Sequence, residues 1–193
     1  MNFRTVQKVC GIWEENLEAG FHDEKREKQE RARGLVEQFF KREFRSLGLF
    51  GTTRTGKSWL LSGALNKRLK SVYDEFGLSM YSMDSDTEKK VLRLCRYMTF
   101  FEFELGLRTA QHDGTMGAYF DSLLSPEFLV VDEIGRGKWS DFTATFFENL
   151  IIKRYGEKKF TAFASNLYLD EFKQMFDNAI LERLKNGKVE ILE

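Results

Sequence analysis

The chain has 193 residues, of which 42% are hydrophobic and 31% are charged, a composition typical of a globular protein of about one domain and unlike disordered or fibrous chains. Thirty basic residues balance thirty acidic ones, so the chain lacks the overall basic excess of an obvious nucleic-acid binder, although local patches remain open to DNA. No apolar run reaches the roughly 18 residues needed to span a bilayer and the N-terminus lacks a secretory signal, so we expect a cytoplasmic protein without membrane contact.

The cysteines and histidines are too few, and too far apart in the sequence, for a zinc site. Cys10 and Cys95 have no neighbouring cysteine, and His22 and His112 do not lie at ligand spacing from them. We therefore expect both cysteines to be reduced and structural.

The first 45 residues are expected to form an N-terminal helical segment, followed by a second unit over residues 46–193. In residues 23–45, charges of both signs alternate with apolar residues spaced three and four apart, which predicts an amphipathic helix. These apolar residues are Leu35, Val36, Phe39, Phe40 and Phe44. A mixed charge run of this kind is usually a solvated helix face without further role.

Strands and helices alternate along the rest of the chain. Residues 46–50 form a short apolar run that ends in Gly51, and apolar residues recur at helical spacing from residue 61 to 76. The further strands are predicted at residues 97–101, 128–131, 160–164 and 189–192, the further helices at residues 84–96, 102–110, 141–154 and 169–184, and a loop at residues 111–116. This order predicts an α/β fold in which helices cover both faces of a parallel five-stranded sheet.

Residues 51–58, GTTRTGKS, match the phosphate-binding pattern G-x-x-x-x-G-K-[ST] at every fixed position. The glycines let backbone N–H groups turn toward phosphate oxygens, and the helix that starts near Lys57 adds the positive end of its dipole. We expect Lys57 to reach the β- and γ-phosphates of ATP and the Ser58 hydroxyl to bind Mg²⁺. A surface turn rich in Gly and Thr is the alternative, which the flanking strand and helix disfavour. The nucleotide contacts are predicted at Gly51, Thr52, Thr53, Arg54, Thr55, Gly56, Lys57 and Ser58.

Two carboxylates follow the apolar strand at residues 128–131 and supply the second half of the predicted site. Ligands bind at the carboxyl edge of parallel strands, where Asp132 and Glu133 would lie. Asp132 is expected to hold Mg²⁺ through water beside the nucleotide, and Glu133 to orient and deprotonate the attacking water. An acidic pair here is as often a helix cap, so this prediction depends on the loop that accompanies it.

Two further polar residues are candidates for catalysis. Asn166 follows the strand at residues 160–164 at the same sheet edge, where its amide would reach the γ-phosphate or the attacking water; an Asn at a strand end also caps turns. Arg183 lies near the end of a helix, where a cation complements the helix dipole without any function. Its alternative role is an arginine finger that acts on the nucleotide of a neighbouring subunit.

The order of motifs is informative as a whole: GKS, then FLVVDEIG, IIKRYGEKK, FTAFASNL, DEF and ILERL. It resembles the AAA+ ATPases of the DnaC-like bacterial helicase-loader family and their transposition relative IstB, over residues 46–193. The resemblance implies a P-loop NTPase three-layer sandwich of AAA+ type without a C-terminal lid domain. It also implies that Lys57 and Ser58 are Walker A contacts, Asp132 and Glu133 the Walker B pair, Asn166 the sensor-1 residue and Arg183 the trans finger.

The resemblance implies a DNA contact as well, and the sequence departs from the family in places. The helical stretch between residues 102 and 124 would match the element by which initiator-type AAA+ proteins touch single-stranded DNA, with Arg108 and Thr109 as contacts. Arg54 stands where family loops commonly have glycine. The acidic pair is Asp-Glu rather than Asp-Asp, which favours hydrolysis, and no zinc-binding or helicase-binding domain is visible ahead of residue 46.

The leading hypothesis is an ATP-dependent homo-oligomer that hydrolyses ATP, assembles on single-stranded DNA and loads or remodels a partner such as a replicative helicase. The first alternative is an IstB-like transposition helper that coats duplex target DNA and serves a transposase. A P-loop small-molecule kinase shares the loop, but the sequence has no arginine-rich lid. A non-hydrolysing, ATP-gated adaptor is the remaining alternative.

Overall fold

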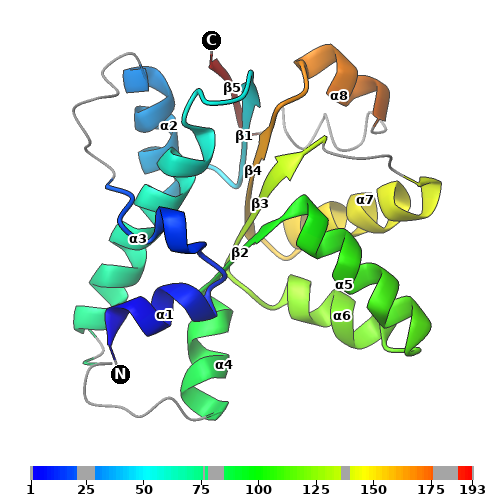
Figure 1. The fold of residues 1–193 in the computed structure, drawn as a ribbon, viewed down its shortest axis with the longest axis horizontal. Coiled ribbons are helices and arrows are strands. Elements are labelled where there is room, and N and C mark those ends of the chain that lie inside the picture. The colour runs from blue at the N-terminus through cyan, green and yellow to red at the C-terminus, as the bar shows by residue number, and fades with distance from the viewer. Residues whose placement is uncertain are drawn as a thin grey trace.

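Five parallel strands form the middle layer of the protein, with helices on both sides (Figure 1). The computed structural model describes residues 2–20, 29–75, 77, 85–135, 140–175 and 187–192. The strands are β1 (Ser46–Gly51), β2 (Cys95–Thr99), β3 (Phe128–Ile134), β4 (Phe160–Ser165) and β5 (Lys188–Leu192), in the order β2-β3-β4-β1-β5. The predicted parallel five-stranded sheet is therefore confirmed, and the C-terminal ends of all strands meet at one edge.

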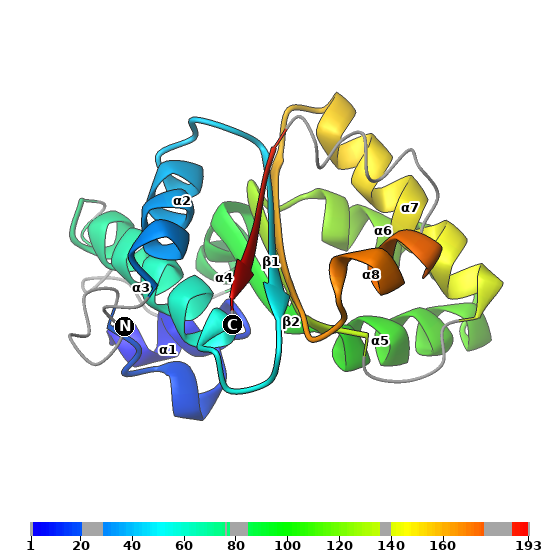
Figure 2. The same cartoon turned by 90° about the horizontal axis from the view of Figure 1, so that it is seen from above.

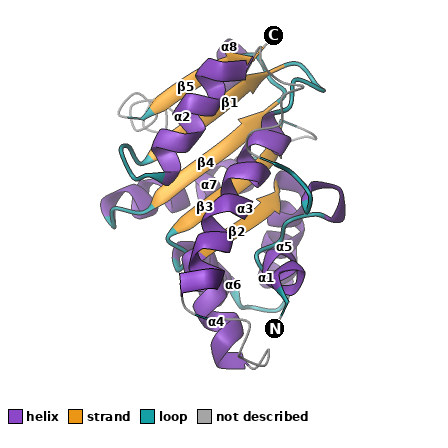
Figure 3. Cartoon of the chain, turned by 90° about the vertical axis from the view of Figure 1, so that its left-hand side faces the viewer, coloured by secondary structure: helices purple, strands orange, loops and turns teal. Residues whose placement is uncertain are grey.

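Two groups of helices cover the two faces of the sheet (Figures 2 and 3). One face carries α1 (Phe3–Val9), α2 (Glu30–Phe40), α3 (Lys57–Glu75) and α4 (Ser85–Leu94), together with the short 3-10 turn η1 (Glu14–Asn16). The other carries α5 (Phe100–His112), α6 (Met116–Leu124), α7 (Asp141–Gly156) and α8 (Leu169–Met175). In the described ranges, no helix is both long and apolar enough to cross a membrane.

The strands are apolar on both sides because each face is covered by helices. Along β3, for example, Phe128 and Val130 belong to the core cluster under α2 and α3, whereas Leu129 and Val131 belong to the cluster under α5 and α7. This alternation follows the two-residue period of a strand. The sheet thereby separates two cores.

The N-terminal residues pack directly on α3 through a buried polar network. The Asn66 side-chain amide donates to the carbonyls of Asn16, Leu17 and Ala19, at 3.1–3.3 Å. Its oxygen accepts from the Gln7 amide at 2.8 Å, and that amide also reaches the Leu17 carbonyl. These hydrogen bonds hold residues 2–20 against α3, the helix that follows the nucleotide loop. The division of the chain into two units at residue 45 remains a prediction.

The N-terminal residues also lie along the outer edge of β2. The backbone N–H of Tyr97 donates to the Cys10 carbonyl at 2.6 Å. The two cysteines are free and buried, and their sulfur atoms lie only 3.2 Å apart despite the long sequence separation. Burial, with Cys10 alongside, raises the pKa of the Cys95 thiol well above its ordinary value, so this thiol stays protonated.

The predicted second strand, residues 97–101, was placed two residues too late. Thr99 is the last residue of β2 and also the N-cap of α5. Its hydroxyl accepts from the Glu102 N–H at 3.2 Å, and the Glu102 carboxylate accepts from the Thr99 N–H at 2.7 Å. This reciprocal capping box makes Phe100 and Phe101 helical although both are apolar and aromatic. The strand correspondingly begins at Cys95, so the predicted charged helix at residues 84–96 ends at Leu94.

Other boundaries differ by smaller amounts. The predicted helix at residues 23–45 is seen as α2, Glu30–Phe40, with residues 23–28 outside the described ranges. The predicted loop at residues 111–116 shrinks because α5 continues to His112 and α6 begins at Met116. The predicted helix at residues 169–184 is described only as α8, and its remainder lies outside the described residues.

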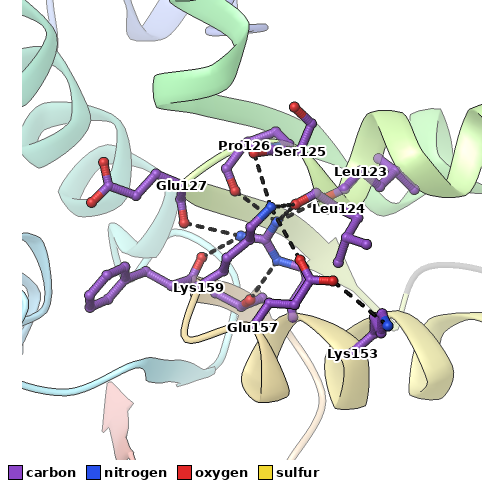
Figure 4. A network of polar contacts seen from close by, with 11 residues as sticks. Leu123, Leu124, Ser125, Pro126, Glu127, Lys153, Glu157 and Lys159 are labelled. Atoms are coloured by element: carbon purple, nitrogen blue, oxygen red, sulfur yellow. Dashed lines mark hydrogen bonds and ion pairs between the residues drawn. The ribbon is translucent and has the colours of Figure 1, made fainter.

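Arg154 of α7 is fully buried at the N-terminal edge of the sheet. Its guanidinium donates to the carbonyls of Leu123, Pro126 and Phe160, at 2.7–3.0 Å, and to the Thr161 hydroxyl at 2.9 Å. Figure 4 labels residues 123–127, which contribute carbonyls to this network of contacts. Burial lowers the pKa of Arg154 to about 9, so the group is still charged at neutral pH. The contacts tie the end of α6 and the start of β4 to one side chain.

Candidate nucleotide site

A cavity of about 560 Å³ opens at the carboxyl edge of the sheet, beside the ends of β1, β3 and β4. It is lined by Asn16, Thr53, Arg54, Gly56, Lys57, Ser58, Trp59, Asp132, Glu133 and Asn166. Segments far apart in the sequence thus meet at the edge where open α/β sheets bind ligands. The predicted loop, acidic pair and asparagine surround one space.

The nucleotide loop has the backbone shape that its glycines permit. Gly51 has a φ of +134°, and a Cβ there would lie 1.9 Å from the Leu192 carbonyl oxygen of the neighbouring β5. Gly56 has a φ of +88°, directly before α3 begins at Lys57. Gly51, Thr52 and Thr55 do not line the cavity; Thr55 instead closes the loop by donating from its hydroxyl to the Thr52 carbonyl at 2.9 Å. The loop therefore folds back over the start of a 19-residue helix, an arrangement suited to anions.

Lys57 is buried and held by the loop itself. Its ammonium lies 2.9 Å from the Gly51 carbonyl oxygen, 2.7 Å from that of Thr52 and 3.2 Å from the Thr55 hydroxyl. Burial lowers the pKa of Lys57, and the negative charge of Asp132 opposes this shift. The side chain is thus placed between the loop and the acidic pair, where a phosphate would find a positive charge already in position.

The acidic pair lies on a break in the ladder between β3 and β4. The register shifts between Val131 and Ile134, and Glu133 has a φ of +58°, a left-handed conformation rare for a non-glycine residue. In a regular strand, neighbouring side chains point to opposite faces, so Asp132 and Glu133 would diverge. The irregular backbone lets both line the same cavity. The Ser165 hydroxyl supports this irregular stretch of β3 by donating to the Ile134 carbonyl at 2.8 Å.

The Asp132 carboxylate is buried, and both of its oxygens accept hydrogen bonds. Oδ1 accepts from the Glu133 N–H at 2.7 Å, and Oδ2 accepts from the Tyr97 hydroxyl. Oxygen ligands suit Mg²⁺, which keeps several waters and takes one or two protein groups besides phosphates. Ser58 and Asp132 both line the cavity and fit this requirement. Among the described residues, no cluster of three His, Cys, Asp or Glu offers an all-protein metal cage.

Arg54 and Asn166 lie on the cavity wall, whereas Arg183 lies outside the described residues. Arg54 is exposed and has a φ of +67°, the conformation that glycine adopts without strain. This backbone conformation explains why loops of the family that the sequence resembles commonly have glycine at this position. Asn166 directly follows β4, as predicted.

Three residues beside this cavity escaped the sequence analysis. Trp59 directly follows the loop in the sequence, so its position next to the GKS motif could have predicted that it lines the cavity. Asn16 reaches the cavity from η1 through contacts with α3, and Tyr97 reaches Asp132 across two strands. Neither of these two carries a local motif, because each position depends on long-range packing.

The predicted DNA contacts Arg108 and Thr109 lie on the exposed side of α5. Arg108 pairs with Glu104 one turn earlier, at 2.8 Å. A shallow groove of about 580 Å³ runs between α5 and α6, and Thr109 lines it together with Leu105 and Tyr119. Phe101 and Leu105, earlier on the same helix, are 67% and 54% exposed.

Comparison with known proteins places these features in context. The family model described as IstB-like ATP binding protein matches residues 89–187. No curated protein matches the sequence. The structure of the DnaC helicase loader is similar with a TM-score of 0.69 and 18% identity, over 94% of this chain and all of that one.

Two DnaA structures are also similar. AMPPCP-bound DnaA from Aquifex aeolicus has a TM-score of 0.67 at 18% identity, over 86% of this chain and 47% of that one. DnaA bound to AMPPCP and single-stranded DNA has a TM-score of 0.64 at 17% identity, over 86% and 46%. The chain thus spans about half the length of these DnaA proteins. At such identities the likeness shows a shared fold, the P-loop sandwich of AAA+ type.

Proposed function

Because the chain belongs to the family of IstB-like ATP-binding proteins, we propose that it is a Mg²⁺-dependent AAA+ ATPase that assembles on single-stranded DNA and loads or remodels a partner such as a replicative helicase. The observation that carries the ATPase proposal is the meeting of the loop, the acidic pair and Asn166 around one cavity. Each group offers chemistry that phosphoryl transfer to water requires.

Binding of ATP begins at the loop. Backbone N–H groups and the N-terminus of α3 attract the phosphates, and Lys57 adds a charge that the loop already holds in place. Ser58 and Asp132 would hold the Mg²⁺ ion, which neutralises phosphate charge when bound. The purine and ribose would extend over the remaining wall, toward Trp59 and Asn16.

Hydrolysis then needs a base and a group that orients water. Glu133 lies on the bulge beside Asp132 and would accept a proton from the attacking water. Asn166, across the same cavity, would donate its amide hydrogens to the γ-phosphate or to that water. Arg183 of an adjacent subunit would complete the site, and fingers of this kind contribute about a thousandfold or more in rate. Hydrolysis would thereby depend on head-to-tail assembly.

The proposed DNA and helicase roles come from the similar structures and from the surface of α5. The helicase loader DnaC aligns over its whole length, and the DnaA match includes a complex with single-stranded DNA. Arg108 and Thr109 are exposed on the same helix as the exposed apolar Phe101 and Leu105, a mixture suited to a phosphate backbone and unstacked bases.

Three substitutions test the ATPase proposal. In Lys57→Ala, ATP binding should be lost; unchanged affinity would refute the nucleotide site. The near-isosteric Glu133→Gln should retain ATP while turnover falls by two or more orders of magnitude, measured by phosphate release. Arg183→Ala should leave affinity for ATP nearly intact and abolish hydrolysis, and an equal loss of both would contradict the trans finger.

A second candidate function is favoured by the family model itself: an IstB-like transposition helper that coats duplex DNA. Glu133→Gln held in ATP distinguishes the two, because its complexes should accumulate. Preference for single-stranded DNA and capture of a helicase support the loader, whereas preference for duplex DNA and capture of a transposase support the helper. Glu133→Gln behaving like the unchanged protein in every assay would indicate a non-hydrolysing adaptor.

A further inference from the structure

The phenol of Tyr97 lies behind the acidic pair, outside the nucleotide cavity. β2 and β3 are parallel neighbours in which Tyr97 faces Val130 and Thr99 faces Asp132. Tyr97 and Asp132 are therefore diagonal neighbours, a separation that an aromatic side chain can bridge. The Tyr97 hydroxyl does so, and donates to Oδ2 of Asp132. Each of the two side chains is only 3% exposed.

This hydrogen bond is one of two that fix the carboxylate. The Glu133 N–H fixes Oδ1 at 2.7 Å, and the Tyr97 hydroxyl fixes Oδ2. A carboxylate has about four acceptor positions, so each oxygen keeps a lone pair for a metal-bound water. The two donors thus determine which lone pairs face the cavity.

The hydroxyl is also held as a donor. An ionised carboxylate can only accept hydrogen bonds, so the phenol is the donor in this contact. Its backbone is fixed as well, because the Tyr97 N–H donates to the Cys10 carbonyl of the N-terminal residues at the outer edge of β2.

We propose that Tyr97 is a positioning residue for the magnesium site: its hydroxyl holds the Asp132 carboxylate in the rotamer that receives the hydrated ion. The proposal rests on the proposed function, in which Asp132 serves Mg²⁺. Asp132 lies next to a residue with a left-handed backbone, where β3 leaves the regular ladder and pairing with β4 no longer sets the orientation of the side chain. The strand on the other side of β3 supplies the orientation instead.

The test measures how much a metal ion improves ATP binding. Dissociation constants of a non-hydrolysable ATP analogue are determined with Mg²⁺ and with EDTA, and Mn²⁺ binding to the nucleotide complex is followed by electron paramagnetic resonance. For Tyr97→Phe we expect the affinity in EDTA to stay within about twofold. The improvement by Mg²⁺ should shrink about tenfold or more, as is common when a group that orients a metal ligand is removed.

Tyr119→Phe is the matched control. It removes a different tyrosine hydroxyl, on the half-buried Tyr119, which donates to the Phe103 carbonyl at 2.8 Å within the α5–α6 pair. It should leave the metal effect unchanged. The affinities with Mg²⁺ and with EDTA are measured on the same preparation, so an unfolded fraction affects both and leaves their ratio unchanged. The test therefore remains informative even if Tyr97→Phe is destabilised.

The outcomes separate the inference from the function beneath it. A normal metal effect in Tyr97→Phe, or an equal loss of affinity with and without metal, would overturn the positioning role. Asp132→Asn tells whether the premise holds: if it also keeps the full metal effect, the proposed magnesium role of Asp132 fails. If Asp132→Asn loses the effect and Tyr97→Phe does not, only the inference about Tyr97 is wrong.

Discussion

Replacement of the buried Arg154 by methionine should destabilise the protein strongly without touching the nucleotide site. Methionine keeps much of the aliphatic stem but removes every donor. The carbonyls of Leu123, Pro126 and Phe160 and the Thr161 hydroxyl each lose the hydrogen bond from the guanidinium. Each buried acceptor without a donor costs about 1–3 kcal/mol, and relief from burying a charge offsets part of that sum. We expect a net loss of about 3 kcal/mol in the free energy of unfolding, a large share for a single domain.

Urea denaturation followed by circular dichroism measures this loss. Lys153→Met is the control, because Lys153 is the neighbouring residue on α7 and its ion pair among the described residues is with the exposed Glu157, at 3.8 Å. Its effect should stay below about 0.5 kcal/mol. A loss below about 1 kcal/mol for Arg154→Met would show that water or a shift of the chain satisfies the carbonyls, and would refute the reasoning.

Two further substitutions probe the loop and the N-terminal residues. Arg54→Gly should raise stability against urea by about 1 kcal/mol, because glycine relieves the left-handed backbone; a loss of stability would mean that the arginine side chain makes a stabilising contact. Asn66→Leu should cost about 2–4 kcal/mol, since it leaves buried carbonyls and the Gln7 amide short of partners. It should also weaken ATP binding several-fold in a fluorescence titration, because Asn16 lines the cavity; full affinity would exclude these residues from the binding wall.

The fold was largely predictable because its main signals are local. The loop at residues 51–58 has fixed spacing, and the apolar run before Asp132 has the length and composition of a buried parallel strand. The start of α5 was missed because Phe100 and Phe101 suit a strand by themselves. The capping box of Thr99 and Glu102 outweighs that preference.

The site was only partly predictable, for a related reason. The motifs and the strands that precede them predicted that the loop, the acidic pair and Asn166 lie at one sheet edge. In the structure, residues from all three line one cavity. Tyr97 and Asn16 carry no pattern, since their roles come from contacts 35 and 50 residues away in the sequence. Such partners become visible only when strand order and helix packing are known.

The position of Arg154 has a mechanical consequence. Its acceptors Pro126 and Glu127 lie directly before β3, and Phe160 begins β4, whereas the proposed nucleotide site lies where these strands end. We expect any change in the angle between the two strands during nucleotide exchange to leave the end held by Arg154 in place. The change would be accommodated at the other end, where a hydrogen bond from Ser165 to Ile134 joins the strands beside Asp132 and Asn166. Arg154 would thereby confine small strand movements to the end of the sheet at which we propose that ATP binds.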